Sequence, residues 1–138
     1  MFKTGFQFRV NSTVIQFLLH CAWVYNVVGI DLVKTESNWL YLKGTQPPSS
    51  PIDAWRSAPF DDGEWIRAQA PFYYDNNGEI SGNTLLSDMR LNYTTLFLRN
   101  KFTLSNPSQI QTLSIEAEID DGFIIWLNGT EVGRHNVN

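Results

Sequence analysis

The sequence predicts an all-β protein, built as an antiparallel β-sandwich or jelly roll. Apolar and polar residues alternate over short segments, polar turn residues separate these segments, and no amphipathic helix longer than two turns is evident after residue 30. Of the 138 residues, 43% are hydrophobic and 14% are aromatic, which favours a packed core over disorder. The length suits one domain.

The first strands are expected between residues 38 and 70. A strand over residues 38–44 places two aromatic residues on one face and two leucines on the other, namely Trp39 and Tyr41, and Leu40 and Leu42. Three prolines and two serines in residues 46–51 mark a surface connection, and a short strand is expected over residues 66–70. A long polar loop then extends to Asn92, and loops of this length are more often functional or mobile than simple connectors.

The later strands are predicted by clearer patterns. Apolar and polar residues alternate over residues 95–104 and again over residues 113–120. Asp120-Asp121-Gly122 interrupts the second alternation, and an apolar run then ends at Asn128-Gly129, the strongest short signal for a hairpin. We therefore expect three antiparallel strands joined by two tight turns between Ile110 and Arg134. The third strand would end as an unpaired edge, so closing strands beyond the C-terminus are expected to be missing.

The first 29 residues have the pattern of a hydrophobic leader. Lys3 and Arg9 precede a mostly apolar segment over residues 14–30, and no acidic residue occurs before residue 31. We expect residues 1–29 to form a leader helix that acts as a secretory signal peptide, ahead of a β-domain over residues 30–138. A membrane anchor and a buried helix of the folded domain are the alternatives.

Removal of the leader would change the chemistry of the chain. Cys21 is the only cysteine, so the remaining chain would have no disulfide, no thiolate metal site and no cysteine nucleophile. Loss of Lys3 and Arg9 takes the charge from 10 basic and 14 acidic residues to 8 and 14, or −6. Such a surface repels nucleic acid and anionic lipid but is compatible with neutral sugars or a bound cation. We expect a secreted or cell-surface protein.

Several motifs, taken in order, resemble a known module. They are Trp39-x-Tyr41, Trp55 to Trp65 with Phe60-Asp61-Asp62 between them, Ala70-Pro71-Phe72, Tyr93 to Phe102, Asp120-Asp121-Gly122-Phe123, and Leu127 to Val132. Their order and spacing resemble the galactose-binding-like β-sandwich module of large secreted bacterial proteins, and are similar to the sugar-binding jelly roll of glycoside hydrolase family 2. Tyr73-Tyr74-Asp75 stands where that family usually has Gly-Tyr-Gly. Members also continue for roughly thirty residues of closing strands.

The paired carboxylates Asp120 and Asp121 are the candidate metal ligands. Followed by glycine in a turn, they could supply oxygen ligands to Ca²⁺, which takes six to eight of them. Resemblance to the Asp-Asp-Gly motif of protective-antigen-type lectin modules implies calcium-assisted sugar binding. The alternative is a solvated hairpin turn, since turns favour Asp and Gly for local reasons. For the similar pair Asp61-Asp62 we expect a cap or turn role.

Aromatic residues near the long loop are the candidate sugar contacts, because exposed rings stack on sugar faces. Asp88 and Arg90 would hydrogen-bond sugar hydroxyls, or else pair with each other at the surface. The tentative carbohydrate-binding residues are Trp55, Tyr73, Tyr74, Asp88, Arg90 and Tyr93. The other tryptophans of the β-domain, Trp39, Trp65 and Trp126, are expected in the core.

These features predict a non-catalytic, secreted carbohydrate-binding module that works beside neighbouring domains of a longer polypeptide. The alternative is a structural spacer without a ligand, and a more distant one is a fragment of a glycoside hydrolase or phosphoesterase. No catalytic residue is expected: His135 has no serine, cysteine or glycine-rich elbow arranged around it, and there is no phosphate-binding loop, zinc spacing or basic stripe.

Overall fold

The computed structural model describes the backbone of residues 2–17 and 23–137, and side chains from residue 29 onward. Within these ranges the protein is mostly β-strand and has no α-helix, which confirms the predicted all-β class. The strands are β1 (Phe2–Phe17), β2 (Trp23–Val33), β3 (Asn38–Lys43), β4 (Ile66–Gln69), β5 (Phe72–Tyr74), β6 (Thr84–Leu85), β7 (Leu96–Arg99), β8 (Thr112–Ile119), β9 (Phe123–Leu127) and β10 (Thr130–His135). Two short 3-10 helices, η1 (Ala54–Arg56) and η2 (Pro107–Gln109), lie in connections.

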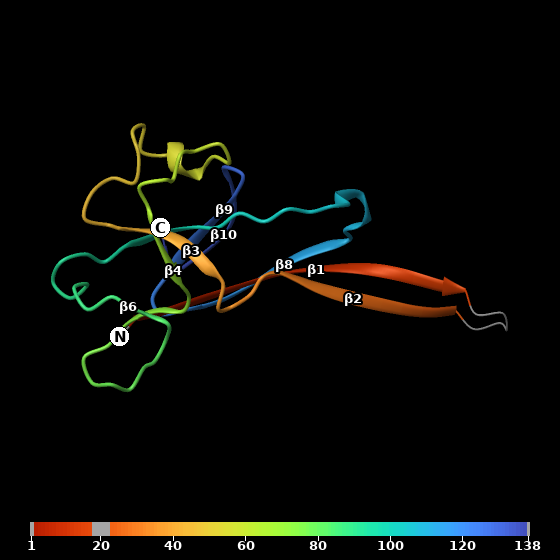
Figure 1. Ribbon diagram of the computed structural model, residues 1–138, viewed down its shortest axis with the longest axis horizontal. Coiled ribbons are helices and arrows are strands. Elements are labelled where there is room, and N and C mark those ends of the chain that lie inside the picture. The colour runs from red at the N-terminus through yellow and green to blue at the C-terminus, as the bar shows by residue number, and fades with distance from the viewer. Residues whose placement is uncertain (1, 18–22, 138) are drawn as a thin grey trace.

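The strands are divided among three small sheets. In the largest, β1 pairs antiparallel with β2, β5 and β8, and β6 adds to β5 as a parallel strand. The second sheet has the order β4-β3-β7, and the third is the β9–β10 hairpin. Figure 1 shows β1 and β2 running together away from the rest of the strands, with β8 beside β1. The finer assignment to a jelly roll stays a prediction.

The prediction of a leader helix over residues 1–29 is wrong for the described residues of this range, because they form β1 and most of β2. Nine of the 16 residues of β1 are β-branched or aromatic, which favours an extended backbone over a helix. Pairing with β8 along residues 4–11 also satisfies backbone groups that a detached leader would expose to water. Cys21 lies outside the described residues. Whether the leader is removed stays a prediction.

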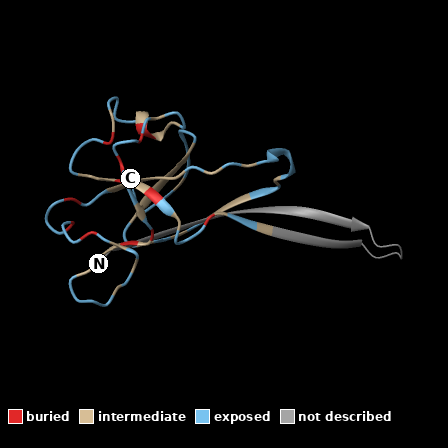
Figure 2. Ribbon diagram, in the orientation of Figure 1, coloured by how far each residue is buried: buried red, intermediate tan, exposed pale blue. Residues whose placement is uncertain are grey.

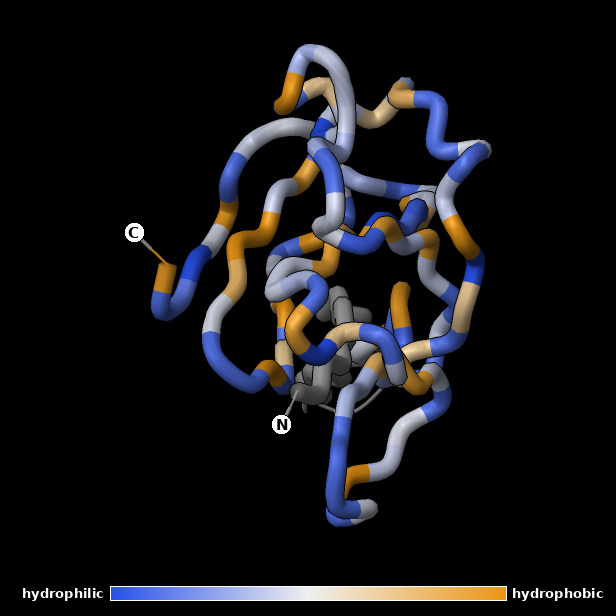
Figure 3. Tube along the Cα trace, turned by 90° about the vertical axis from the view of Figure 1, so that its left-hand side faces the viewer, coloured by the Kyte–Doolittle hydropathy of each residue, from blue (hydrophilic) through white to orange (hydrophobic). Residues whose placement is uncertain are grey.

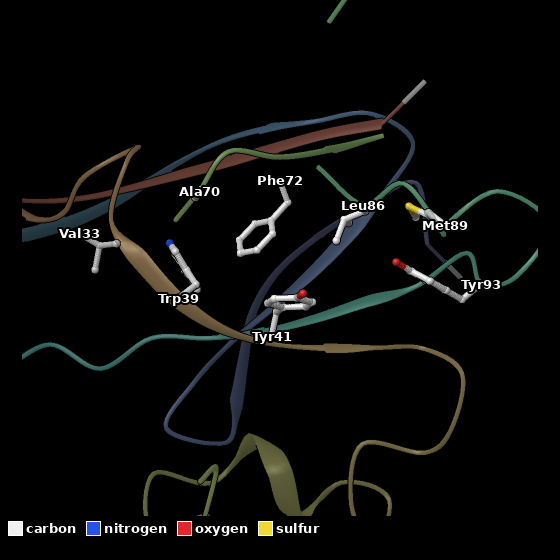
Figure 4. Close-up of a cluster of buried hydrophobic side chains, with 8 residues drawn as sticks. All are labelled: Val33, Trp39, Tyr41, Ala70, Phe72, Leu86, Met89 and Tyr93. Carbon is white, nitrogen blue, oxygen red and sulfur yellow. The ribbon is translucent and has the colours of Figure 1, made fainter. Parts of the chain in front are cut away.

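The core lies between the first and second sheets. Trp39 and Tyr41 of β3 are buried on the predicted face, and the ring of Tyr41 lies 5.3 Å from that of Phe72 on β5. Figure 4 shows the ring of Phe72 directed toward these two residues. Phe72 is fully buried, which stabilises the fold by about 1.5–3 kcal/mol. The remaining buried members of the core are Val33, Ala70, Leu86, Met89 and Tyr93.

The direction of packing in β7 follows the alternation that the sequence predicts. Figure 3 shows short hydrophobic stretches alternating with hydrophilic ones along the chain. In β7, Leu96 and Leu98 pack on the core, whereas Phe97 contacts Trp55 on the opposite face. Buried positions are few and are separated by exposed loops (Figure 2). The predicted connection over residues 46–51 contains no strand, and the predicted strand over residues 66–70 is β4.

One of the two predicted tight turns is confirmed. Leu127 pairs with Thr130 across Asn128-Gly129, whose φ angles of 51° and 87° are the positive values that such a turn requires. The other turn is wrong: β8 pairs with β1 and not with β9, so residues 120–122 form a corner between two sheets. β8 instead forms eight consecutive register pairs with β1, and β9 pairs only with β10.

The position of β1 predicts that residues 1–29 contribute to folding. A chain that begins at residue 30 lacks all of β1. As a result β8 loses its partner strand, and β5 loses the three residue pairs that it forms with β1. We expect this shortened chain to lose the cooperative thermal unfolding transition of the full chain, measured by circular dichroism. An unchanged melting temperature would contradict the structural role of β1 and agree with a removable leader.

Candidate functional site

A polar cluster lies where β3 ends and the long loop returns to β7. The Lys43 ammonium donates a hydrogen bond to Asp88 Oδ2 at 2.7 Å, and the Tyr93 hydroxyl donates to Asp88 Oδ1 at 3.1 Å. Lys43 Nζ also lies 5.9 Å from the centre of the Tyr93 ring. The side chains of Lys43 and Asp88 remain 31% and 46% exposed, so water or a ligand can reach the ion pair.

The electrostatics of the cluster keep Asp88 charged. The hydrogen bond from Lys43 lowers the pKa of Asp88 below its usual value, although desolvation opposes this effect. Desolvation raises the pKa of Tyr93, and the neighbouring Asp88 carboxylate raises it further. Asp88 is therefore an acceptor and Tyr93 a neutral donor at neutral pH.

The loop that carries Asp88 is held by its own hydrogen bonds. The Asp75 carboxylate accepts the backbone N–H groups of Asn77 and Ile80, and these bonds lower its pKa. Further along, the Leu86 N–H donates to the Tyr73 carbonyl at 2.8 Å. The predicted long loop is confirmed in outline, but these bonds and the short strand β6 give it order that the sequence did not indicate.

The other predicted sugar contacts on this side differ in exposure. Tyr73 and Tyr74 lie on β5 and are half-buried, and the Tyr74 hydroxyl hydrogen-bonds the side chain of Asn76. Arg90 is exposed and forms no ion pair with Asp88, which pairs with Lys43 instead. Tyr93 is 6% exposed and belongs to the core. Its hydroxyl donates to Asp88 and its ring lies near the Lys43 ammonium, so little of the ring is accessible to a sugar.

Trp55 lies on the opposite face of the second sheet, inside an aromatic cluster. It is 8% exposed, and its ring contacts those of Trp65, Phe97 and Trp126 at centroid distances of 6.0, 5.3 and 5.3 Å. The guanidinium of Arg56 covers the Trp126 ring at 4.5 Å. These contacts leave little of the Trp55 ring for a sugar, and the structure does not bring Trp55 near Asp88.

A buried ion pair under this cluster involves residues that the sequence did not single out as partners. Arg99 Nε donates to Asp62 Oδ2 at 2.9 Å, and Lys101 Nζ lies 3.1 Å from the same oxygen. Arg99 Nη1 also donates to the carbonyl oxygens of Trp55 and Ser57. The Arg99 and Asp62 side chains are only 9% and 11% exposed. The signal available in the sequence was the position of Arg99 at the end of the apolar run of β7, because a charge that becomes buried is normally paired with an opposite charge.

The pKa of Asp62 reflects this pairing. Burial on its own raises the pKa, but hydrogen bonds and charge attraction from Arg99 and Lys101 outweigh it, so the pKa lies below its usual value. The neighbouring Asp61 has the expected turn role, because its Oδ1 accepts the Gly63 N–H at 3.1 Å. Both groups therefore have structural roles.

The candidate calcium ligands lie at the corner between β8 and β9. Asp120 and Asp121 are exposed, and the Asp121 carbonyl accepts a hydrogen bond from Asn136 Nδ2 at 3.0 Å. Within the described residues, no group of three or more His, Cys, Asp or Glu side chains is placed to hold a metal ion. Two carboxylates fall well short of the six to eight oxygens that Ca²⁺ takes, so these residues alone do not fit the ion.

Comparisons with known proteins leave the chain without an assigned relative. No protein-family model, curated protein or solved structure matches it. Nor does the described part of the chain contain a helix with the length and apolar character needed to cross a membrane. The class that the structure defines is therefore a mostly β protein of several small antiparallel sheets.

Replacement of Arg99 by methionine tests the buried ion pair. Arg99→Met leaves the Asp62 carboxylate buried without its main partner, so we expect a loss of about 3–5 kcal/mol in the free energy of unfolding. Lys101→Met is the matched control, because the Lys101 side chain is 60% exposed and its loss costs less than about 1 kcal/mol. Urea denaturation of the three proteins measures both values. Equal effects of the two substitutions would contradict the proposed importance of Arg99.

The lowered pKa of Asp62 also predicts a pH dependence. The carboxylate stabilises the fold above its pKa in the unfolded chain, about 4, and this contribution is lost as the pH falls through the lower folded value. The native protein is expected to be more stable than Arg99→Met. We therefore expect this difference in unfolding free energy to shrink as the pH falls from about 5 to about 2. Denaturation at several pH values measures it, and a constant difference would contradict this assignment.

Proposed function

We propose that this chain is a non-catalytic, secreted accessory module of the galactose-binding-like jelly-roll type, and that it binds a neutral carbohydrate at the surface around Asp88. The observation that carries the proposal is the exposed Lys43–Asp88 ion pair, held in place by Tyr93. An ionised carboxylate accepts hydrogen bonds from sugar hydroxyls, and an ammonium donates to their oxygens.

The surroundings of this pair support the same chemistry. Arg90 lies exposed two residues from Asp88 and can donate further hydrogen bonds. Half-buried Tyr73 and Tyr74 lie at the start of the same loop, and their rings keep some accessible area for a sugar face. The net charge of −4 favours a neutral glycan over an anionic one. Neighbouring domains of a longer polypeptide would supply any catalysis.

A spacer without a ligand is the second candidate, and one observation favours it. Trp55 and Tyr93, two of the four aromatic residues that the sequence suggested for stacking, are buried in separate clusters. In this case the Lys43–Asp88 pair would only fasten the long loop to β3. An exposed ion pair contributes at most about 1 kcal/mol to stability. If the pair only fastens the loop, breaking it therefore has a small effect on stability and none on glycan binding, whereas a binding role predicts a loss of glycan affinity.

The Asp88→Asn substitution separates the two functions. It keeps the size of the side chain but removes the charge that accepts hydrogen bonds, so we expect glycan affinity to fall at least about tenfold, or 1.4 kcal/mol. A glycan array identifies the bound sugar, and calorimetric titration with that sugar measures the affinity.

Asp53→Asn is the matched control for this experiment. Asp53 is exposed in the connection before η1, so its substitution changes the net charge equally at a distant place in the sequence. It should leave glycan affinity unchanged. If the native protein binds no glycan on the array, or if both variants bind as it does, carbohydrate binding at Asp88 is excluded and the spacer is favoured.

A further inference from the structure

A groove separates β8 from the β9–β10 hairpin. Its volume is about 360 Å³, within the range of roughly 300–1,000 Å³ that is typical of ligand pockets. Its apolar lining comes from all three strands, from Ile115 and Ala117 of β8, Phe123 and Ile125 of β9, and Val132 and Gly133 of β10. The opposite face of β9 is already covered, because Trp126 packs on Trp55 and Arg56. Among the side chains that the structure describes, the groove is therefore the side of the hairpin that remains open.

The strands around the groove each have a partner strand on one side only. Within the described residues, β8 pairs with β1 alone and β9 pairs with β10 alone. Figure 1 shows β9 and β10 side by side and β8 continuing along β1. An extended segment that adds to the second edge of β8 finds backbone donors and acceptors there, and its side chains on one face then lie beside Ile115 and Ala117 in the groove.

The charges beside the groove select the kind of segment. Residues 102–130 contain four acidic residues and no Lys or Arg. Glu116 is exposed on the face of β8 opposite to Ile115 and Ala117. At the rim, Arg134 donates two hydrogen bonds of 2.6 and 2.7 Å to the Glu131 carboxylate. Its charge is therefore neutralised and does not favour a negatively charged ligand. A segment with basic residues would be attracted.

The pairing of β8 with β1 shows which pattern this strand accepts. Phe6 and Phe8 of β1 are in register with Ala117 and Ile115, and Gln7 between them is in register with Glu116. Arg9 follows in the same alternation. The partner strand of β8 in this fold thus alternates apolar with polar or basic residues.

We propose that the groove between β8 and the β9–β10 hairpin is an acceptor site for one extended segment of another polypeptide, in which apolar residues alternate with basic ones. The apolar side chains enter the groove beside Ile115 and Phe123, and the basic ones lie on the same face as Glu116. A second copy of β8 is a poor occupant, because antiparallel pairing of two such strands brings Glu116 and Glu118 close to their like-charged counterparts.

Binding of a synthetic peptide to the full chain tests the site. The peptide has eight residues that alternate valine with lysine, and a matched peptide carries glutamate in place of lysine. By fluorescence anisotropy we expect the lysine peptide to bind at least about tenfold more tightly than the glutamate peptide. Gly133→Leu should abolish binding, because a side chain at position 133 meets no atom within 4 Å and projects into open space.

Two further variants separate this site from general charge attraction. Glu116→Gln should weaken binding of the lysine peptide by about threefold, the effect of one exposed charge pair. Glu64→Gln, an equal charge change at an exposed residue outside the groove, should leave it unchanged. No binding of the lysine peptide, equal binding of the two peptides, or retention of binding in a folded Gly133→Leu protein would overturn the proposal. So would a dimer of the native chain that Gly133→Leu dissociates, since the occupant would then be a second copy.

Discussion

The guanidinium of Arg99 connects the irregular segment after β3 to the second sheet. It binds the Asp62 carboxylate and the carbonyl oxygens of Trp55 and Ser57, so one side chain fixes three points of a segment that has only one short 3-10 helix. The aromatic cluster around Trp55 depends on this arrangement, because the segment supplies two of its four rings, those of Trp55 and Trp65. Phe97 on β7 and Trp126 on β9 complete the cluster. Through it, the β9–β10 hairpin is held against the second sheet.

The second sheet is thereby covered on both faces. Trp39 and Tyr41 face the main core with Phe72, and Phe97 faces the aromatic cluster. Small domains bury a smaller fraction of their surface than large ones, so a second covered face adds stability. The loops that complete each layer are fastened by polar contacts, Asp62–Arg99 on one side and Lys43–Asp88 on the other.

These two ion pairs have different physical consequences. The Asp62–Arg99 pair is buried, so removal of one partner leaves a charge that water cannot solvate. The Lys43–Asp88 pair is partly exposed, so other molecules can reach it. Burial therefore distinguishes the structural carboxylate of Asp62 from that of Asp88, which a ligand can reach, although both residues occur in polar turn sequences. Tyr93 is buried, and its hydroxyl donates to the more exposed carboxylate of Asp88.

The sequence determined what depends on local spacing. Alternation placed Trp39 and Tyr41 on the core face of β3, and Asn128-Gly129 specified the β9–β10 turn, because side-chain direction in a strand and positive φ at a turn are properties of neighbouring residues. Only the tertiary structure decided which strands pair. The pairing of β8 with β1 and the burial of Asp62 beside Arg99 join residues more than 30 positions apart, and backbone hydrogen bonds and ion pairs between such residues depend on a packing that no local pattern encodes.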